Sequence, residues 1–264
     1  MPFESSKHPH ISHILNDVFQ YSGPPLKIDI KSDLYSAAGL GSSAALSNAM
    51  GAALQELVAP ESALDLVSLA RMGHSAEANA QKGRASPTDT ATSALGGCVV
   101  VSGTSLAGTN HIFDATLETP EGSRNWSISR VDIPEIEDVW LVLGFTGIGS
   151  PTGEMVAGVS ELLKSDPIKM KEIEAIGQIT HSGLRALSSG NMEGVGQAMN
   201  ECQERLRKIG VSSPELENLI SATERHSLGT KLTGAGGGGC MVSLTRNPKR
   251  VAESIEIAGG RPLV

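Results

Sequence analysis

The sequence is poor in cysteine and has no long apolar run. Its three cysteines, Cys98, Cys202 and Cys240, are widely spaced and form no Cys-x-x-Cys pair, which argues against a zinc knuckle or a dithiol redox motif. No apolar stretch approaches the length of a membrane span, and the segment before Gly23 is interrupted by histidines and Asp17 instead of forming the core of a signal peptide. We therefore expect a cytoplasmic protein with reduced thiols and no membrane association.

Positive charge is in deficit. Lysine and arginine number 21 against 29 acidic residues, a formal net charge of -8, which argues against non-specific binding to nucleic acid or anionic lipid. The chain has 264 residues, of which 39% are hydrophobic and 19% charged, so it is globular and long enough to bury a core. An anionic substrate must therefore bind where positive charge or partial positive charge is concentrated locally.

Two large kinase classes, the P-loop kinases and the protein kinases, are excluded because their motifs are missing. The sequence contains no Gly-x-x-x-x-Gly-Lys-Ser/Thr phosphate loop and no His-Arg-Asp or Asp-Phe-Gly set.

Periodicity and turn residues predict blocks of helices and strands, with turns at Gly103 and at Pro120-Glu121-Gly122. The predicted strands are 26–30, 97–101, 125–131, 139–145, 231–232, 240–244 and 261–264. The predicted helices are 10–21, 42–58, 60–80, two from 152 to about 179, 192–209, 213–229 and 248–258. Because these elements do not repeat as βαβ units, we expect an α+β fold with two lobes that meet near 145–155.

A glycine turn precedes the helix predicted to begin at Ser42. In Ala38-Gly39-Leu40-Gly41-Ser42-Ser43-Ala44-Ala45 the glycines allow close backbone approach, and exposed N–H groups at a helix start favour phosphate. The alternative is a simple N-capped helix after a tight turn. A dinucleotide-binding motif is disfavoured because a second helix follows where the second strand of a βαβ unit should lie.

Two further segments are candidates for chemistry. Asp89, in Gly83-Arg84-Ala85-Ser86-Pro87-Thr88-Asp89-Thr90, has the carboxylate to orient or deprotonate a substrate hydroxyl, the alternative being a helix cap. In Lys231 to Cys240, four consecutive glycines favour a loop that lies flush against a ligand, the alternative being a bulged turn or close backbone packing.

In this order, Gly39 to Ala45, Ser86-Pro87-Thr88-Asp89 and Lys231 to Cys240 resemble the superfamily of galactokinase, homoserine kinase, mevalonate kinase and phosphomevalonate kinase (GHMP kinases), and most of all archaeal mevalonate kinases. The resemblance implies a two-lobed fold. Residues 1–147 would form an ATP-binding lobe like domain 2 of ribosomal protein S5, and residues 148–264 a ferredoxin-like lobe. The family's strand-rich first segment, with its lysine, is expected to be missing from the front of this chain, which leaves the first lobe incomplete.

The resemblance also implies roles for individual residues. Asp89 would be the catalytic carboxylate facing the C5 hydroxyl of mevalonate, and Ser43 and Glu77 would hold Mg²⁺, with ATP as co-substrate. The ATP phosphates would lie against Ala38, Gly39, Leu40, Gly41, Ser42, Ser43 and Ala44. The loop beside phosphates and substrate would be Thr233, Gly234, Ala235, Gly236 and Gly237.

The implied function is phosphorylation of mevalonate in isoprenoid precursor biosynthesis, by a homodimer. Two alternatives stay open at this point. One is another kinase of the same superfamily, acting on homoserine, on phosphomevalonate or on a different hydroxyl of mevalonate. The other is a protein that binds a nucleotide or metabolite with weak or no turnover.

Overall fold

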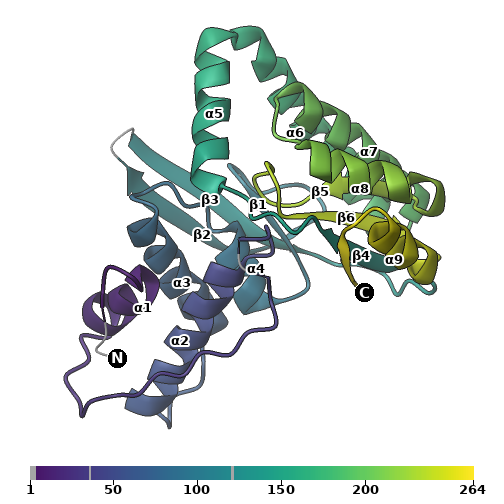
Figure 1. The fold of residues 1–264 in the computed structure, drawn as a ribbon. Helices are drawn as coiled ribbons and strands as arrows, with labels where there is room; N and C mark the ends of the chain where they lie inside the picture. The colour runs from purple at the N-terminus through teal and green to yellow at the C-terminus, as the bar shows by residue number, and fades with distance from the viewer. Residues whose placement is uncertain (1–3, 36, 120–121) are drawn as a thin grey trace. The chain divides into compact units, whose positions relative to one another are not determined.

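A computed structural model describes residues 4–35, 37–119 and 122–264, in which helices and sheets form two compact units (Figure 1). The first unit consists of the chain up to Asp33 together with Gly41–Asp132, and the second of Leu34–Leu40 together with Ile133–Val264. The predicted domains, 1–147 and 148–264, differ from this division at 34–40 and 133–147. Those domain boundaries remain a prediction.

The first unit packs helices against a short antiparallel sheet. Its helices are α1 (Pro9–His13), continued by a π-helix (Ile14–Val18), then α2 (Ser42–Val58), α3 (Leu66–Ala80) and α4 (Thr88–Leu95). Its described strands are β1 (Cys98–Ser102), β2 (Asn110–Thr119) and β3 (Gly122–Val131), in the order β1-β3-β2. Phe113 and Ile128 of the sheet pack against Ala70 and Ala91 of the helices, so this face of the sheet is the core side.

Local sequence accounts for most of these helices. α2 has the predicted bounds and buries Met50 and Leu54, whereas Leu57 near its C-terminal end is 52% exposed. The prediction that the next helix begins at residue 60 is wrong. α3 begins at Leu66 because the carboxylate of Asp65 accepts the N–H groups of Val67 and Ser68 and so caps the first turn.

The predictions of strands in this unit were partly wrong. The segment 26–30 alternates as a strand should, but it forms no strand and has no ladder partners among the described residues. Leu26, Ile28 and Ile30 are 37% to 52% exposed, because alternation stabilises a strand only when a neighbour covers its apolar face. β2 was not predicted, although its alternate residues Phe113 and Ala115 are buried. Of the predicted turn, Pro120 and Glu121 lie outside the described residues.

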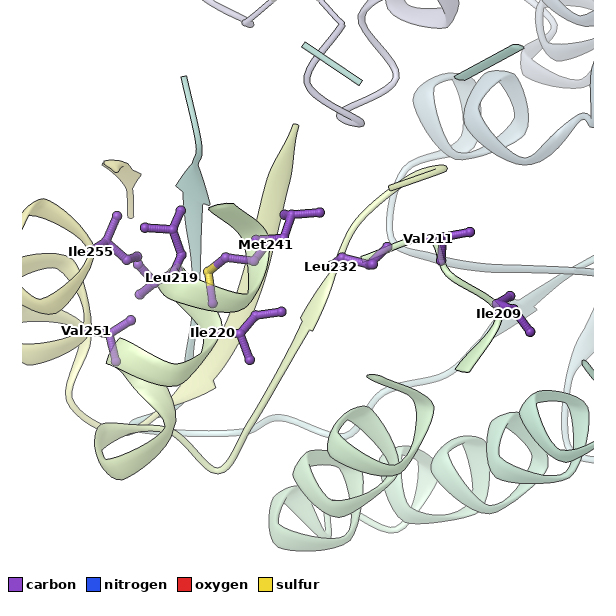
Figure 2. Packing of buried hydrophobic residues seen from close by; sticks show 10 residues of the cluster. Ile209, Val211, Leu219, Ile220, Leu232, Met241, Val251 and Ile255 are labelled. Carbon is purple, nitrogen blue, oxygen red and sulfur yellow. The ribbon is translucent and has the colours of Figure 1, made fainter. Parts of the chain in front are cut away.

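The second unit places helices around a four-stranded antiparallel sheet, ordered β5-β6-β4-β7 in the described residues. The strands are β4 (Trp140–Phe145), β5 (Gly229–Leu232), β6 (Cys240–Thr245) and β7 (Arg261–Leu263). The helices are α5 (Thr152–Ser165), α6 (Met170–Ser188), α7 (Met192–Lys208), α8 (Pro214–Thr223) and α9 (Pro248–Ile257), with 3₁₀ turns at Pro167–Lys169 and Glu224–His226. Figure 2 shows how Leu219 and Ile220 of α8 and Val251 and Ile255 of α9 gather with Met241 of β6 in its core.

Helix and strand predictions in this unit are confirmed apart from their ends. Ser213 caps α8 by accepting the N–H of Leu216, and Pro214 lies in the first turn, so the helix begins close to its predicted start at residue 213. The helix ends at Thr223 and not at Gly229, because Ser227 to Leu232 is extended and pairs with β6. In the described part of the chain, no helix combines the length and apolarity needed to cross a membrane.

Candidate active site

α2 begins at a glycine that lies against Asp89. Gly41 is the N-cap with φ of 66°, and no side chain caps the helix. A Cβ on residue 41 would come within 3.3 Å of the Asp89 Cβ, so both the conformation and the contact favour glycine. The helix thus follows a turn and has a glycine N-cap, and phosphate binding at its start remains a prediction. The uncapped N–H groups and the helix dipole favour an anion at the start of this 17-residue helix, beside Asp89.

Glu77 of α3 is a buried carboxylate, 5% exposed, next to the first turn of α2. Its Oε2 accepts a 2.7 Å hydrogen bond from Gln81 Nε2, and its Oε1 lies 3.3 Å from His10 Nε2 of α1. Burial opposes ionisation, but interactions with His10, Ser43 and Gln81 outweigh it and lower the pKa of Glu77. Glu77 is thus an ionised carboxylate that interacts with Ser43.

Asp89 lies in the first turn of α4 and caps nothing, since Pro87 is the N-cap and no side-chain cap is formed. The alternative of a helix-capping aspartate is therefore wrong. Its side chain stays accessible, but the protein around it reduces hydration of the carboxylate. This desolvation, with the negative charge of Glu77, raises the pKa of Asp89. An accessible carboxylate of raised basicity suits the abstraction of a proton from a hydroxyl.

The donors around Glu77 fit a hard divalent cation. Ser43 offers a hydroxyl and Glu77 a carboxylate whose Oε1 is buried and finds no hydrogen-bond partner in the described part of the chain. Oxygen donors of this kind suit Mg²⁺, which takes one or two protein ligands and completes its shell with phosphates and water. Within the described residues no group of three or more histidines, cysteines or acids is placed to hold a metal by itself. Ser43 and Glu77 are therefore suited to a cation that arrives with phosphate.

The second unit holds the other predicted segment, Thr233 to Gly239, against Ala38 and Gly39. Cys240 N donates to Ala38 O at 2.9 Å, and a Cβ on Gly39 would lie 3.0 Å from the Thr233 carbonyl oxygen. Ala38 is 1% exposed and packs with Phe145 and Cys240. This packing fixes the backbone of residues 38–40 beside the glycine-rich loop.

Close packing alone requires glycine in much of this loop. Gly236 has φ of 83°, and a Cβ there would lie 2.0 Å from the Val211 carbonyl oxygen. A Cβ at Gly237 or Gly239 would also come closer than 3.0 Å to a neighbouring atom. Gly236 O accepts a 2.6 Å hydrogen bond from Ser150 Oγ. The run of glycines is thus accounted for by backbone packing, and contact of the loop with a ligand remains a prediction.

The predicted phosphate-binding residues are divided between the units. Gly41, Ser42, Ser43 and the buried Ala44 belong to the first, with Glu77 and Asp89. Ala38, Gly39 and Leu40 belong to the second, with the predicted loop residues Thr233, Gly234, Ala235, Gly236 and Gly237. Within each unit the structure brings these residues together.

Residues that the sequence did not single out support the site. Gln81 follows Glu77 by four residues, a helical spacing that would have indicated the contact. Asn48 of α2 donates from Nδ2 to Thr90 O at 2.9 Å, and His10 comes from a distant helix. For Asn48 and His10 no local pattern in the sequence signals a role.

Comparisons with known proteins identify the family of the chain. The family model for the N-terminal domain of GHMP kinases matches residues 10–97, and that for the C-terminal domain matches residues 184–259. A mevalonate kinase of Pyrococcus furiosus is 32% identical over 247 residues, which cover 90% of this chain and 66% of that protein. The chain thus spans slightly less than two thirds of the length of this relative.

Solved structures share the fold. A mevalonate kinase of Methanococcus jannaschii matches with a TM-score of 0.67 and 24% identity over 96% of this chain and 72% of its own. A Streptococcus pneumoniae phosphomevalonate kinase matches with a TM-score of 0.72 and 18% identity over 100% of this chain and 82% of its own. With its two matching domain models and its archaeal relatives, the chain belongs to the GHMP kinase family, and its two-unit α+β structure is that family's fold.

Proposed function

We propose that this protein is an ATP-dependent kinase that phosphorylates the C5 hydroxyl of mevalonate. One observation carries the proposal: Ser43, Glu77 and Asp89 lie together at the start of α2. An anion-binding helix start, donors for a divalent cation and a basic carboxylate are the parts that phosphoryl transfer to an alcohol needs. The acceptor is inferred from the relatives named mevalonate kinase.

Each residue has a distinct task in the proposed reaction. The N–H groups of Gly41, Ser42 and Ser43 hold phosphate oxygens, and Asp89 accepts the proton of the substrate hydroxyl. The hydroxyl oxygen bonds to the γ-phosphorus of ATP as the bond from that phosphorus to ADP breaks. Ser43 and Glu77 hold Mg²⁺, which when bound offsets the negative charge of the phosphates. Positioning and electrostatic stabilisation supply most of the catalysis.

Phosphomevalonate is the second candidate acceptor, because a phosphomevalonate kinase shares this fold over the whole chain. The fold does not separate the two acceptors, whereas the mevalonate kinases related at about 32% identity favour mevalonate.

A substrate panel tests the proposal. ADP release is measured with mevalonate, phosphomevalonate and homoserine, and NMR of the product identifies the carbon that carries the phosphate. We expect turnover with mevalonate and phosphate on C5. Asp89→Asn should lower kcat by about 10²-fold or more, as loss of a general base does, and keep ATP binding. Turnover with another acceptor, or ATP binding without ADP release, would replace this function.

We further propose that the kinase acts as a cytoplasmic homodimer. The low cysteine content supports the cytoplasmic location, and the family resemblance supports the dimer. Sedimentation at micromolar concentration should give twice the mass of the 27.4 kDa chain. A monomer over the whole concentration range would remove the dimer from the proposal.

A further inference from the structure

The two oxygens of the Glu77 carboxylate have different surroundings. Oε2 accepts the hydrogen bond from Gln81 Nε2, whereas Oε1 is buried and has no hydrogen-bond partner among the described residues. His10 Nε2 lies 3.3 Å from Oε1 but is not aligned as a hydrogen bond. Burying a polar group without a partner is unfavourable, and more so for a charged one. A ligand that supplies a partner to Oε1 would therefore remove this cost.

Gln81 is placed to orient this carboxylate by the helix that carries both residues. It is the C-cap of α3, four residues after Glu77, and its backbone N–H donates to Glu77 O at 2.9 Å. Gln81 itself is exposed, so its amide reaches from the surface to a buried carboxylate. An amide donor fixes the carboxylate without cancelling its charge, whereas a lysine or arginine would compete with a cation.

Contacts from two other helices restrict the carboxylate further. Ser43 of α2 and His10 of α1 both approach Glu77, and α1, α2 and α3 pack beside one another in the first unit (Figure 1). Of these contacts, the hydrogen bond from Gln81 is accepted by Oε2, whereas the contact with His10 is on Oε1.

We propose that Gln81 is a positioning residue, whose side-chain amide holds Glu77 so that Oε1 is offered to a divalent cation. This inference rests on the proposed function, in which Glu77 is a ligand of Mg²⁺. Groups that hydrogen-bond to a metal-ligating side chain change metal affinity by about 10–100-fold when they are removed. A structural role alone would affect stability instead, but the capping contact of Gln81 is made by its backbone and survives a change of side chain.

Manganese binding tests this role. Mn²⁺ is titrated by electron paramagnetic resonance in the presence of a non-hydrolysable ATP analogue, with wild type, Gln81→Leu and Asn79→Leu. Asn79 is an exposed amide on the same helix and serves as the matched control. Gln81→Leu should raise the Kd of Mn²⁺ about 10-fold or more, with unchanged melting and unchanged binding of the analogue without metal. Asn79→Leu should behave as wild type.

A double-mutant cycle with Glu77→Gln separates the inference from the proposed function. If Gln81 acts through Glu77, Gln81→Leu has no further effect on the Mn²⁺ Kd once Glu77 is replaced. Weaker Mn²⁺ binding in Glu77→Gln but wild-type binding in Gln81→Leu overturns the role of Gln81 and leaves the metal site standing. Full Mn²⁺ affinity in Glu77→Gln overturns both the role of Gln81 and the proposed metal site at Glu77. Equal effects of Gln81→Leu in the two backgrounds also overturn the role, because they place Gln81 outside the Glu77 contact.

Discussion

Asn48 of α2 donates a 2.9 Å hydrogen bond to the carbonyl oxygen of Thr90, the residue that follows Asp89 in α4. Asn48 is 4% exposed, and this bond joins the helix that carries Ser43 to the helix that carries Asp89. α3 contributes Gly73 at the same point, where a Cβ would lie 2.1 Å from Asn48 Oδ1. The spacing of the candidate catalytic groups therefore depends on one buried amide and on the absence of a side chain opposite it.

The hydrogen bond of Asn48 should matter for stability. Asn48→Leu removes the donor and replaces the amide by a larger apolar group of similar branched shape, so we expect a loss of about 1–3 kcal/mol in the free energy of unfolding. Urea unfolding measures it, with exposed Asn79→Leu as the control, expected to stay within about 0.5 kcal/mol of wild type. Equal changes in the two variants would show that the buried amide contributes nothing specific.

Gly73 and Gly177 give a matched pair of helical glycines. Nothing lies within 4 Å of a Cβ built on Gly177 of α6, so Gly177→Ala should stabilise by up to about 1 kcal/mol through helix propensity. Gly73→Ala meets Asn48 and should destabilise by about 1–3 kcal/mol, as overpacked cores do. Thermal unfolding of both variants checks the opposite signs. Stabilisation by Gly73→Ala would mean that Asn48 has room to move.

Asp89 should make wild type less stable at neutral pH than its amide variant. Desolvation and the charge of Glu77 raise its pKa, so its stabilising contribution is present below the unfolded pKa and is lost as pH rises through the folded pKa. Asp89→Asn should therefore raise the Tm at pH 7, and the gain should shrink toward pH 4.

Asp114 serves as the opposite case for this test. A hydrogen bond with His111 lowers its pKa, so its contribution is present at pH 7 and is lost as pH falls. Asp114→Asn should lower the Tm at pH 7, with a smaller effect at acid pH. A lower Tm for Asp89→Asn at pH 7 would contradict the raised pKa of Asp89.

Local signals in the sequence predicted the elements of this fold better than the contacts between them. The bounds of α2 and the cap at Ser213 follow from residues that act on their own helix. The segment 26–30 shows the limit, since its alternation is that of a strand but pairing depends on neighbours that the sequence does not reveal.

The candidate site shows the same difference between local signals and contacts made between distant parts of the chain. Asp89 and Ser43 were found from motifs, and Gln81 lies at a helical spacing from Glu77 that could have been used. The bond from Asn48 to Thr90 joins residues 42 positions apart, and no periodicity predicts such a pair.

Gly236 should be needed for stability before it is needed for ATP binding. The sequence favours a loop that lies flush against a ligand, so a bulky residue at position 236 would weaken ATP binding, but φ of 83° and the 2.0 Å approach of a Cβ to Val211 O make folding the property affected first. A residue with a Cβ pays about 1–2 kcal/mol for the left-handed conformation and must also displace the backbone at Val211. Gly236→Ala should therefore lower the free energy of unfolding by about 2 kcal/mol or more.

Ala235→Gly, which changes only the neighbouring Cβ, should cost less than about 1 kcal/mol. Urea unfolding measures both, and the KM for ATP is then determined where each variant is fully folded. Wild-type stability with a raised KM in Gly236→Ala would instead show that the loop is shaped for the nucleotide and that Val211 yields.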